Sequence, residues 1–106
     1  MTDQTTPRVA LIAGGAGGMG AAIAARLSSE GYAVAIADLE SERLTATVDT
    51  LTAGGGDALA VPLDMRRIAS CAAAVDVVLA WRGRLDVVVN SAGVWREGDS
   101  VTMTEA

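Results

Sequence analysis

Residues 9–20 read VALIAGGAGGMG, a short apolar run that leads into five glycines within seven residues. The residues that follow are rich in alanine and suit a helix. A buried strand, a glycine turn and a helix, in this order, form the setting in which a glycine-rich stretch binds phosphate. The first N–H groups of such a helix and the positive end of its dipole favour an anion. We therefore expect this turn to bind a nucleotide.

The glycines fit two spacings, and the sequence leaves both open. Gly15, Gly17 and Gly20 satisfy G-x-G-x-x-G. The pattern G-x-x-x-G-x-G is satisfied by Gly14, Gly18 and Gly20. In either case, glycine allows positive φ and a close approach of the backbone to a pyrophosphate. The plainer alternative is a tight strand-to-helix turn with no ligand.

Four apolar segments alternate with three helical patterns. We expect strands at residues 8–13, 33–37, 58–63 and 85–89, and helices at residues 18–30, 40–52 and 66–82. Near-continuous apolar strands joined by helices predict an α/β fold with a parallel sheet. A switch point after the first strand gives the order 3-2-1-4, a truncated Rossmann-like sheet of four strands with three helices.

Periodicity within the helices predicts their buried faces. In the second helix these are Leu44, Val48 and Leu51. In the third they are Ile68, Ala72, Val75 and Leu79. Gly31 is expected just after the end of the first helix.

Composition limits the classes of function. A chain of 106 residues holds one domain at most, and its net charge of −5 leaves no basic surface for nucleic acid or an anionic membrane. Histidine and lysine are absent and Cys71 is alone, so we expect no metal site and no internal disulfide. The apolar stretch at residues 9–25 is too short and too rich in glycine to span a membrane, and the N-terminus is not a basic leader. We expect a cytoplasmic protein.

Asp38 ends the second expected strand, a little over 20 residues beyond the glycine turn. A carboxylate there can accept hydrogen bonds from the adenosine ribose and would repel a 2′-phosphate. Leu39 follows, where an arginine would favour the phosphorylated cofactor. NAD is therefore expected in preference to NADP. The alternative role for Asp38 is the N-cap of the second helix, and both roles can coexist.

Two further polar groups follow the third and fourth strands. Asp64 precedes the third helix and could simply cap it. Asn90-Ser91-Ala92-Gly93 could be an ordinary turn, because its residues are turn formers.

Together, these features resemble the short-chain dehydrogenase/reductase family, from Arg8 to Ala106. The resemblance rests on Ala13-Gly14-x-x-x-Gly18-x-Gly20, Asp38, Asp64 and Asn90-Ser91-Ala92-Gly93, in this order. It implies the N-terminal, cofactor-binding part of an oxidoreductase that moves hydride between a nicotinamide and a small alcohol or carbonyl substrate. It also implies a homo-oligomer for the full-length form.

The resemblance also assigns roles to single residues. It implies that Asp64 and the backbone of Met65 bracket the adenine. It implies that Asn90, Ala92 and Gly93 line the adenosine ribose side and brace the fourth strand. The full set expected to bind the cofactor is Gly14, Gly17, Gly18, Met19, Gly20, Asp38, Leu39, Asp64, Met65, Asn90, Ala92 and Gly93.

The chain departs from the family pattern in three ways. Ala13 stands where threonine is usual, which removes a hydroxyl that ties the glycine turn to the segment after the fourth strand. Ser91 stands where a second asparagine is common. The family's catalytic Ser, Tyr and Lys fall beyond the part that this chain resembles, so we assign no catalytic residue. We expect a partial NAD(P)-binding Rossmann domain over residues 1–106, with a flexible tail at 1–7 and the start of a truncated segment at 94–106.

Two other functions remain open. One is a non-catalytic truncated nucleotide-binding protein, or a degenerate gene product. The other is a binder of flavin or another nucleotide on the same half-fold, which Asp64 and the Asn-Ser-Ala-Gly segment make less favourable.

Overall fold

The computed structural model describes residues 6–14, 16–39, 41–64 and 67–91. Strands and helices alternate as β1 (Val9–Ala13), α1 (Gly18–Ser29), β2 (Ala33–Asp38), α2 (Glu42–Ala53), β3 (Asp57–Pro62), α3 (Ile68–Arg82) and β4 (Val87–Asn90). Every expected element is present, with ends that differ by a residue or two. The expected tail is described only at its last two residues, and the expected segment at 94–106 lies outside the described residues.

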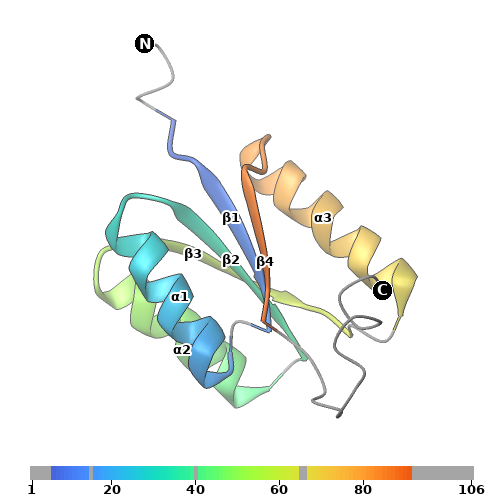
Figure 1. The fold of residues 1–106 in the computed structure, drawn as a ribbon, viewed down its shortest axis with the longest axis horizontal. Coiled ribbons are helices and arrows are strands. Elements are labelled where there is room, and N and C mark those ends of the chain that lie inside the picture. Colours follow the sequence, from blue (N-terminus) through green and yellow to red (C-terminus); the bar gives the residue numbers. More distant parts are fainter. Residues whose placement is uncertain (1–5, 15, 40, 65–66, 92–106) are drawn as a thin grey trace, which may run out of the picture.

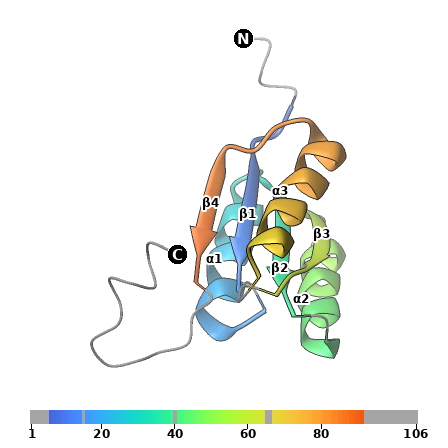
Figure 2. The same cartoon turned by 90° about the vertical axis from the view of Figure 1, so that its right-hand side faces the viewer.

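The four strands form one parallel sheet in the order β3-β2-β1-β4, which confirms the predicted topology. α1 and α2 cover one face of this sheet and α3 covers the other (Figures 1 and 2). Because all the strands are parallel, their carboxyl ends lie at one edge. In the register, Ala13 of β1 lies beside Ala37 of β2 and Asn90 of β4, and Asp38 lies beside Pro62 of β3.

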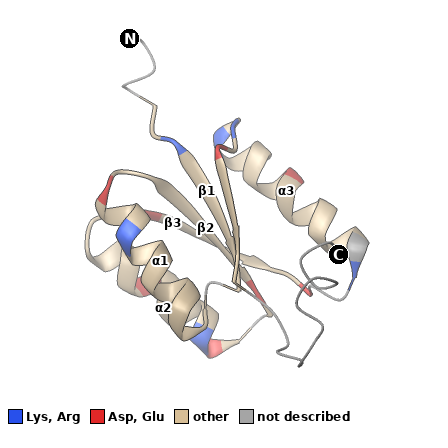
Figure 3. Ribbon diagram, viewed as in Figure 1, with Lys and Arg blue, Asp and Glu red and all other residues tan. Residues whose placement is uncertain are grey.

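The core is divided by the sheet into two layers. On the face covered by α1 and α2, Ile12 and Ile36 pack with Leu44 and Leu51. The predicted buried face of α2 is confirmed, since Leu44 and Leu51 are buried and Val48 packs against the same cluster. Figure 3 shows the middle of the sheet free of charged residues, which lie on helices and at the ends of strands. Burial of apolar surface on both faces is the main term that stabilises such a sheet.

The buried face predicted for α3 is wrong at Ala72 and Leu79 and confirmed at Val75. Ala74 and Val78 are buried against the sheet and Cys71 and Val75 are half-buried, whereas Leu79 is 42% exposed. Ala72 is also exposed, and Val75 is the one described side chain of the predicted face that packs against the core. The side chain of Ile68 lies outside the described part of the structure. α3 is apolar on nearly every side, so its sequence period does not select a face. Packing against the sheet determines which side of α3 is buried, because the small alanines of β2 face this helix.

Two helix ends carry clear capping signals. α1 ends at Ser29, and Gly31, with a φ of +96°, follows its C-cap as predicted. The N–H of Gly31 donates to the carbonyl of Ser28 and the N–H of Tyr32 to that of Leu27, which is the Schellman pattern. α2 begins at Ser41, whose hydroxyl accepts the N–H of Leu44 at 3.2 Å. Ser41 is therefore the N-cap of α2, and the alternative that gave Asp38 this role is wrong.

An ion pair orders the opposite edge of the sheet, where the strands begin. The guanidinium of Arg84 donates two hydrogen bonds to the Asp86 carboxylate, at 2.9 and 2.8 Å. Asp86 also accepts the N–H of Val9 at 2.8 Å. The bond from Arg84, followed by that from Val9, lowers the pKa of Asp86 below its ordinary value. This carboxylate therefore stabilises the start of β1 in its ionised form.

Candidate functional site

The sequence-predicted site residues that the structure describes gather at the carboxyl edge of the sheet. β1 ends at the glycine turn, β2 at Asp38, β3 just before Asp64 and β4 at Asn90. The strand order is not sequential at β1, whose neighbours are β2 on one side and β4 on the other. Ligands of open parallel sheets bind at such a switch point, outside the carboxyl ends of the strands.

Among the described residues of the glycine turn, Gly14 is the one in the left-handed region. Gly14 has a φ of +82°, and its N–H donates to the carbonyl of Ala37 at 2.7 Å. Gly17 is the N-cap of α1, and its N–H donates to the carbonyl of Gly14 at 3.2 Å. The positive φ falls on the first glycine of the spacing G-x-x-x-G-x-G. Gly15, which begins the other spacing, lies outside the described residues.

The first turn of α1 offers backbone N–H groups to the same edge. The first hydrogen bond of the helix runs from the N–H of Ala21 to the carbonyl of Gly17, at 2.7 Å. Helix geometry gives the N–H groups of Gly18, Met19 and Gly20 no acceptor within the helix. These donors and the positive end of the helix dipole can therefore receive an anion.

Space is open on the outer side of this turn. Gly18 is exposed, and a Cβ placed on it would meet no atom of the described residues within 4 Å. Met19 is 73% exposed, which is unusual for so large an apolar side chain. Gly20, by contrast, is buried in α1 together with Ala24. Gly14 thus shapes the turn, Gly20 is buried within the helix and Gly18 leaves room outside it.

Asp38 is anchored to the glycine turn. One carboxylate oxygen accepts the N–H of Ala16 at 3.1 Å, and the other accepts the N–H of Leu39 at 2.8 Å. An ionised carboxylate offers about four lone-pair sites, so both oxygens can accept further bonds. The structure thus holds a negative charge in a defined place beside the turn. The contact with Ala16 is one that the sequence did not reveal.

A pocket of about 530 Å³ opens between the ends of β2 and β3 and the start of α3. Its lining includes two predicted residues, Leu39 and Asp64, and residues that sequence reasoning missed, namely Pro62, Leu63, Arg67, Ala69 and Ser70. Leu39 is 56% exposed, so an apolar wall faces the open space. Apolar walls with a few polar groups are typical of pockets for small flat ligands.

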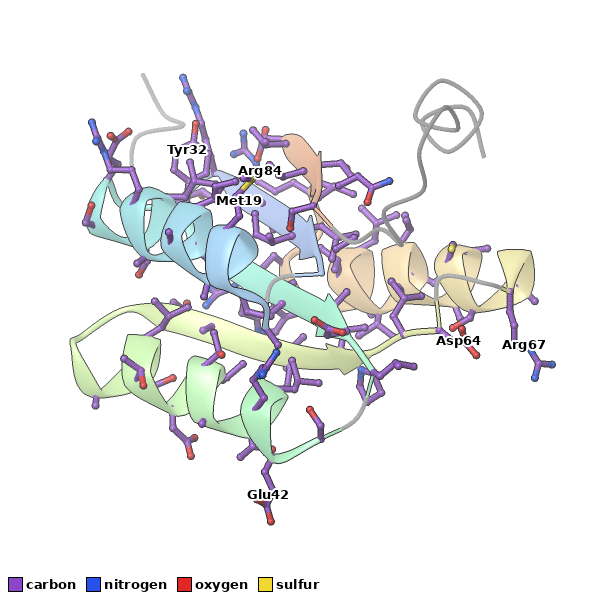
Figure 4. All side chains as sticks on the ribbon, turned by 60° about the horizontal axis from the view of Figure 1, so that its bottom comes forward. Met19, Tyr32, Glu42, Asp64, Arg67 and Arg84 are labelled. Atoms are coloured by element: carbon purple, nitrogen blue, oxygen red, sulfur yellow. The ribbon has the colours of Figure 1, made fainter. Side chains whose placement is uncertain are left out.

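Asp64 is joined to α3 through its backbone. Its N–H donates to the Ser70 hydroxyl at 3.1 Å, and its carbonyl accepts the N–H of Arg67 at 3.0 Å. Figure 4 shows Asp64 and Arg67 together at the first turn of α3. Arg67 occupies the N-cap of α3, with no capping bond from a side chain, so the alternative that made Asp64 the cap is wrong.

The segment after β4 lies against the glycine turn. Asn90 ends β4 beside Ala13, and Ser91 donates both its N–H and its hydroxyl to carbonyls of the turn. The expected sites at Met65, Ala92 and Gly93 lie outside the described residues. The sequence placed Ser91 in the Asn-Ser-Ala-Gly segment and marked it as a departure from the family pattern, but its contacts were not foreseen.

Residues 8–106 match the family model described as short chain dehydrogenase. The chain belongs to this family. The resemblance read from the sequence is thereby confirmed, and the order β3-β2-β1-β4 is its Rossmann-like α/β fold. Short-chain dehydrogenases are oxidoreductases that bind a nicotinamide dinucleotide.

Several relatives of known name share the sequence. The chain is 39% identical over 99 residues to (2S)-[(R)-hydroxy(phenyl)methyl]succinyl-CoA dehydrogenase subunit BbsD of Thauera aromatica, covering 93% of this chain and 40% of the relative. It is 40% identical over 98 residues to 2,5-dichloro-2,5-cyclohexadiene-1,4-diol dehydrogenase of Sphingobium indicum, covering 92% and 39% respectively. The chain thus spans about two fifths of the length of these short-chain dehydrogenases.

Solved structures of family members have the same fold. A short-chain dehydrogenase/reductase from Serratia marcescens superposes with a TM-score of 0.82 at 39% identity, over 91% of this chain and 40% of that one. A variant of actinorhodin polyketide ketoreductase with NADPH superposes with a TM-score of 0.80 at 35% identity, over 83% and 34%. This fold therefore accommodates a phosphorylated dinucleotide in at least one relative.

Neither a membrane-spanning helix nor a cluster of metal ligands occurs in the described part of the chain. None of its helices combines the length and the apolar character needed to cross a bilayer. Within the same residues, no three His, Cys, Asp or Glu side chains gather closely enough to hold a metal ion.

Proposed function

We propose that the chain is the cofactor-binding part of a short-chain oxidoreductase that uses NAD. The observation that carries the proposal is the carboxylate of Asp38, held beside the glycine turn by the N–H groups of Ala16 and Leu39. In this assignment the pyrophosphate meets the first N–H groups of α1, at Gly18, Met19 and Gly20. When bound, the nicotinamide supplies the site that accepts or donates hydride.

The same assignment gives the remaining residues their roles. The glycine turn, with Gly14 and Gly17, brings the backbone close to the pyrophosphate. The pocket walled by Leu39 and Asp64 takes the adenine, and the backbone of Met65 closes it. Asn90, Ala92 and Gly93 line the ribose side and brace β4. The open space outside Gly18 is consistent with a ligand at this edge.

The preference for NAD over NADP rests on charge. A 2′-phosphate would place about two negative charges next to the ribose, where Asp38 already carries one. Leu39 offers no compensating charge. Arg67 lines the pocket and is the described group that could oppose this preference. Because the ketoreductase neighbour holds NADPH, the fold alone does not select the cofactor.

Titration of the chain with NAD⁺, NADP⁺ and flavin mononucleotide tests the proposal. Isothermal calorimetry should show NAD⁺ bound more tightly than NADP⁺, with flavin mononucleotide weaker than both. Tighter binding of NADP⁺ would refute the assignment of Asp38 to the ribose. Tighter binding of flavin mononucleotide would replace the proposal with a flavin site on the same half-fold.

The activity of the whole protein is a separate part of the proposal. We infer hydride transfer between the nicotinamide and a small alcohol or carbonyl substrate, in a cytoplasmic homo-oligomer. Because the 106 residues contain no lysine, the Tyr-x-x-x-Lys pair of the family would have to lie outside them. Continuous reading of the coding sequence past codon 106 into such a pair would support an active enzyme. A stop codon there would favour a non-catalytic nucleotide-binding protein.

A further inference from the structure

Ser91 joins the end of β4 to the glycine turn through two of its groups. Its N–H donates to the carbonyl of Ala13 at 2.9 Å. Its hydroxyl oxygen lies 3.1 Å from the same carbonyl and 3.3 Å from the carbonyl of Gly14. A serine hydroxyl has one proton, so these two carbonyls share it or receive it in turn. One half-buried residue thus contacts two successive peptide groups that lie 77 and 78 positions earlier in the chain.

One of the two carbonyls that Ser91 contacts belongs to a glycine, whose backbone no side chain restricts. Gly14 has a φ of +82° and no side chain to restrict its rotation. The Gly14 carbonyl also accepts the N–H of Gly17 at 3.2 Å. Gly17 is the N-cap of α1. The orientation of the Gly14 carbonyl is therefore linked directly to the place where α1 begins.

The turn is held from both sides of β1. On the β2 side, the N–H of Gly14 donates to the carbonyl of Ala37 at 2.7 Å, and Asp38 accepts the N–H of Ala16. On the β4 side, Ser91 supplies the two contacts already described. The contact with Asp38 orients an N–H group, whereas the hydroxyl of Ser91 orients carbonyls. The two restraints are complementary, and neither can replace the other.

We propose that Ser91 is a positioning residue of the nucleotide site. Its hydroxyl sets the Ala13 and Gly14 carbonyls, and through Gly17 it sets the direction of the first N–H groups of α1. Ser91 itself touches no phosphate in this arrangement. The proposal rests on the proposed function, since the anion at those N–H groups is the pyrophosphate of the dinucleotide.

A purely structural serine at a strand end would behave differently. Loss of such a residue loosens β4 and weakens every ligand of the edge to the same degree. Loss of a residue that orients the turn weakens binding of the pyrophosphate. It leaves the adenine pocket, which Leu39 and Asp64 line, unchanged. Comparison of ADP with adenosine separates the structural role from the positioning role, because of these two ligands only ADP carries a pyrophosphate.

The test uses the full chain with Ser91→Ala, Ser91→Thr and the control Ser29→Ala. Ser29 also donates its hydroxyl to a backbone carbonyl, that of Arg26 at 2.7 Å, but it lies at the exposed far end of α1. NMR titration with ADP and adenosine gives the dissociation constants. Ser91→Ala should weaken ADP by about threefold to tenfold, the range expected for one hydrogen bond. Adenosine binding should not change, and Ser91→Thr and Ser29→Ala should bind ADP like the parent.

Equal loss of ADP and adenosine in Ser91→Ala, or no loss of either, would overturn the proposal. Amide exchange of the ligand-free chain supplies an independent measurement. The N–H of Gly17 should exchange faster in Ser91→Ala than in the parent, because its acceptor, the Gly14 carbonyl, loses a restraint. Unchanged exchange at Gly17 would also overturn the proposal. If the parent chain binds no ADP, the proposed function fails, and exchange at Gly17 still decides whether the Ser91 hydroxyl restrains the glycine turn.

Discussion

Gly18 allows nucleotide binding to be separated from folding. It is the first residue of α1, its φ is not in the left-handed region, and a Cβ on it would meet nothing within 4 Å. Replacement by alanine therefore disturbs no contact of the described chain. The new methyl group meets no described residue, whereas a ligand on the outer side of the turn would meet it. Gly18→Ala and the larger Gly18→Val should consequently fold and lose nucleotide.

Gly18→Ala should raise the stability of the fold and lower the affinity for nucleotide. Alanine is a better helix former than glycine by up to about 1 kcal/mol in a helix interior, so Gly18→Ala should be at least as stable as the parent. In a domain of this size, that gain corresponds to a rise in Tm of a few degrees, up to about 8 °C. A methyl group that displaces the pyrophosphate from one backbone donor removes a hydrogen bond to a charged group, worth about 1.5–3 kcal/mol. Affinity should therefore fall by at least about tenfold, and further for valine.

Calorimetric titration with NAD⁺ and thermal unfolding followed by circular dichroism measure both effects. Gly54→Ala is the matched control. Gly54 has a φ of −83°, is exposed at the end of α2, and has only ordinary contacts for an added Cβ, the nearest at 3.6 Å. Its variant should bind NAD⁺ like the parent. If Gly18→Val keeps the parent's affinity while folded, the pyrophosphate does not lie at the start of α1 and the assignment of the glycine turn is refuted.

Three further variants test other parts of the structure. Asp38→Arg should weaken NAD⁺ and favour NADP⁺ in the same titration, and an unchanged preference would remove Asp38 from the ribose site. Ser41→Ala should lower the free energy of unfolding by about 1 kcal/mol through loss of the α2 cap, and denaturant titration that shows no loss would contradict that cap. Asp86→Asn tests how the stability of the fold depends on pH. Because the folded pKa of Asp86 is lowered, its contribution to stability is present above the unfolded pKa, ordinarily 3.8, and is lost as pH falls through the folded pKa. The Tm of Asp86→Asn should thus depend less on pH than that of the parent in the acid range, and parallel Tm curves would contradict the ion pair with Arg84.

The order of elements and the sheet topology could be predicted because they depend on local patterns. Each strand is a short apolar run, and α2 has one clear apolar stripe that includes Leu44 and Leu51. The glycine turn stands out because few residues other than glycine adopt the φ of Gly14. These signals are read from neighbouring residues and need no knowledge of the rest of the fold.

Long-range packing set the features that could not be predicted. α3 has apolar residues all round, so its buried face depends on the alanines that β2 presents to it. Asp38 and Ser41 are both residue types that cap helices, and only the path of the chain after β2 decides which of them does so. The contacts of Ser91 join residues almost 80 positions apart, and no local pattern records them. The residues lining the pocket beyond Leu39 and Asp64 were missed for the same reason.

The anchoring of Asp38 links the two halves of the proposed nucleotide site. Its carboxylate closes the glycine turn through Ala16 and is also the group proposed to bind the ribose. Since both oxygens keep lone pairs after the bonds to Ala16 and Leu39, ribose hydroxyls can bind without breaking either contact. Ligand binding then adds to an arrangement that already exists, which limits the entropy lost on binding. A substitution at Asp38 should therefore affect the pyrophosphate as well as the ribose, whereas one at Leu39 should affect only the adenosine half.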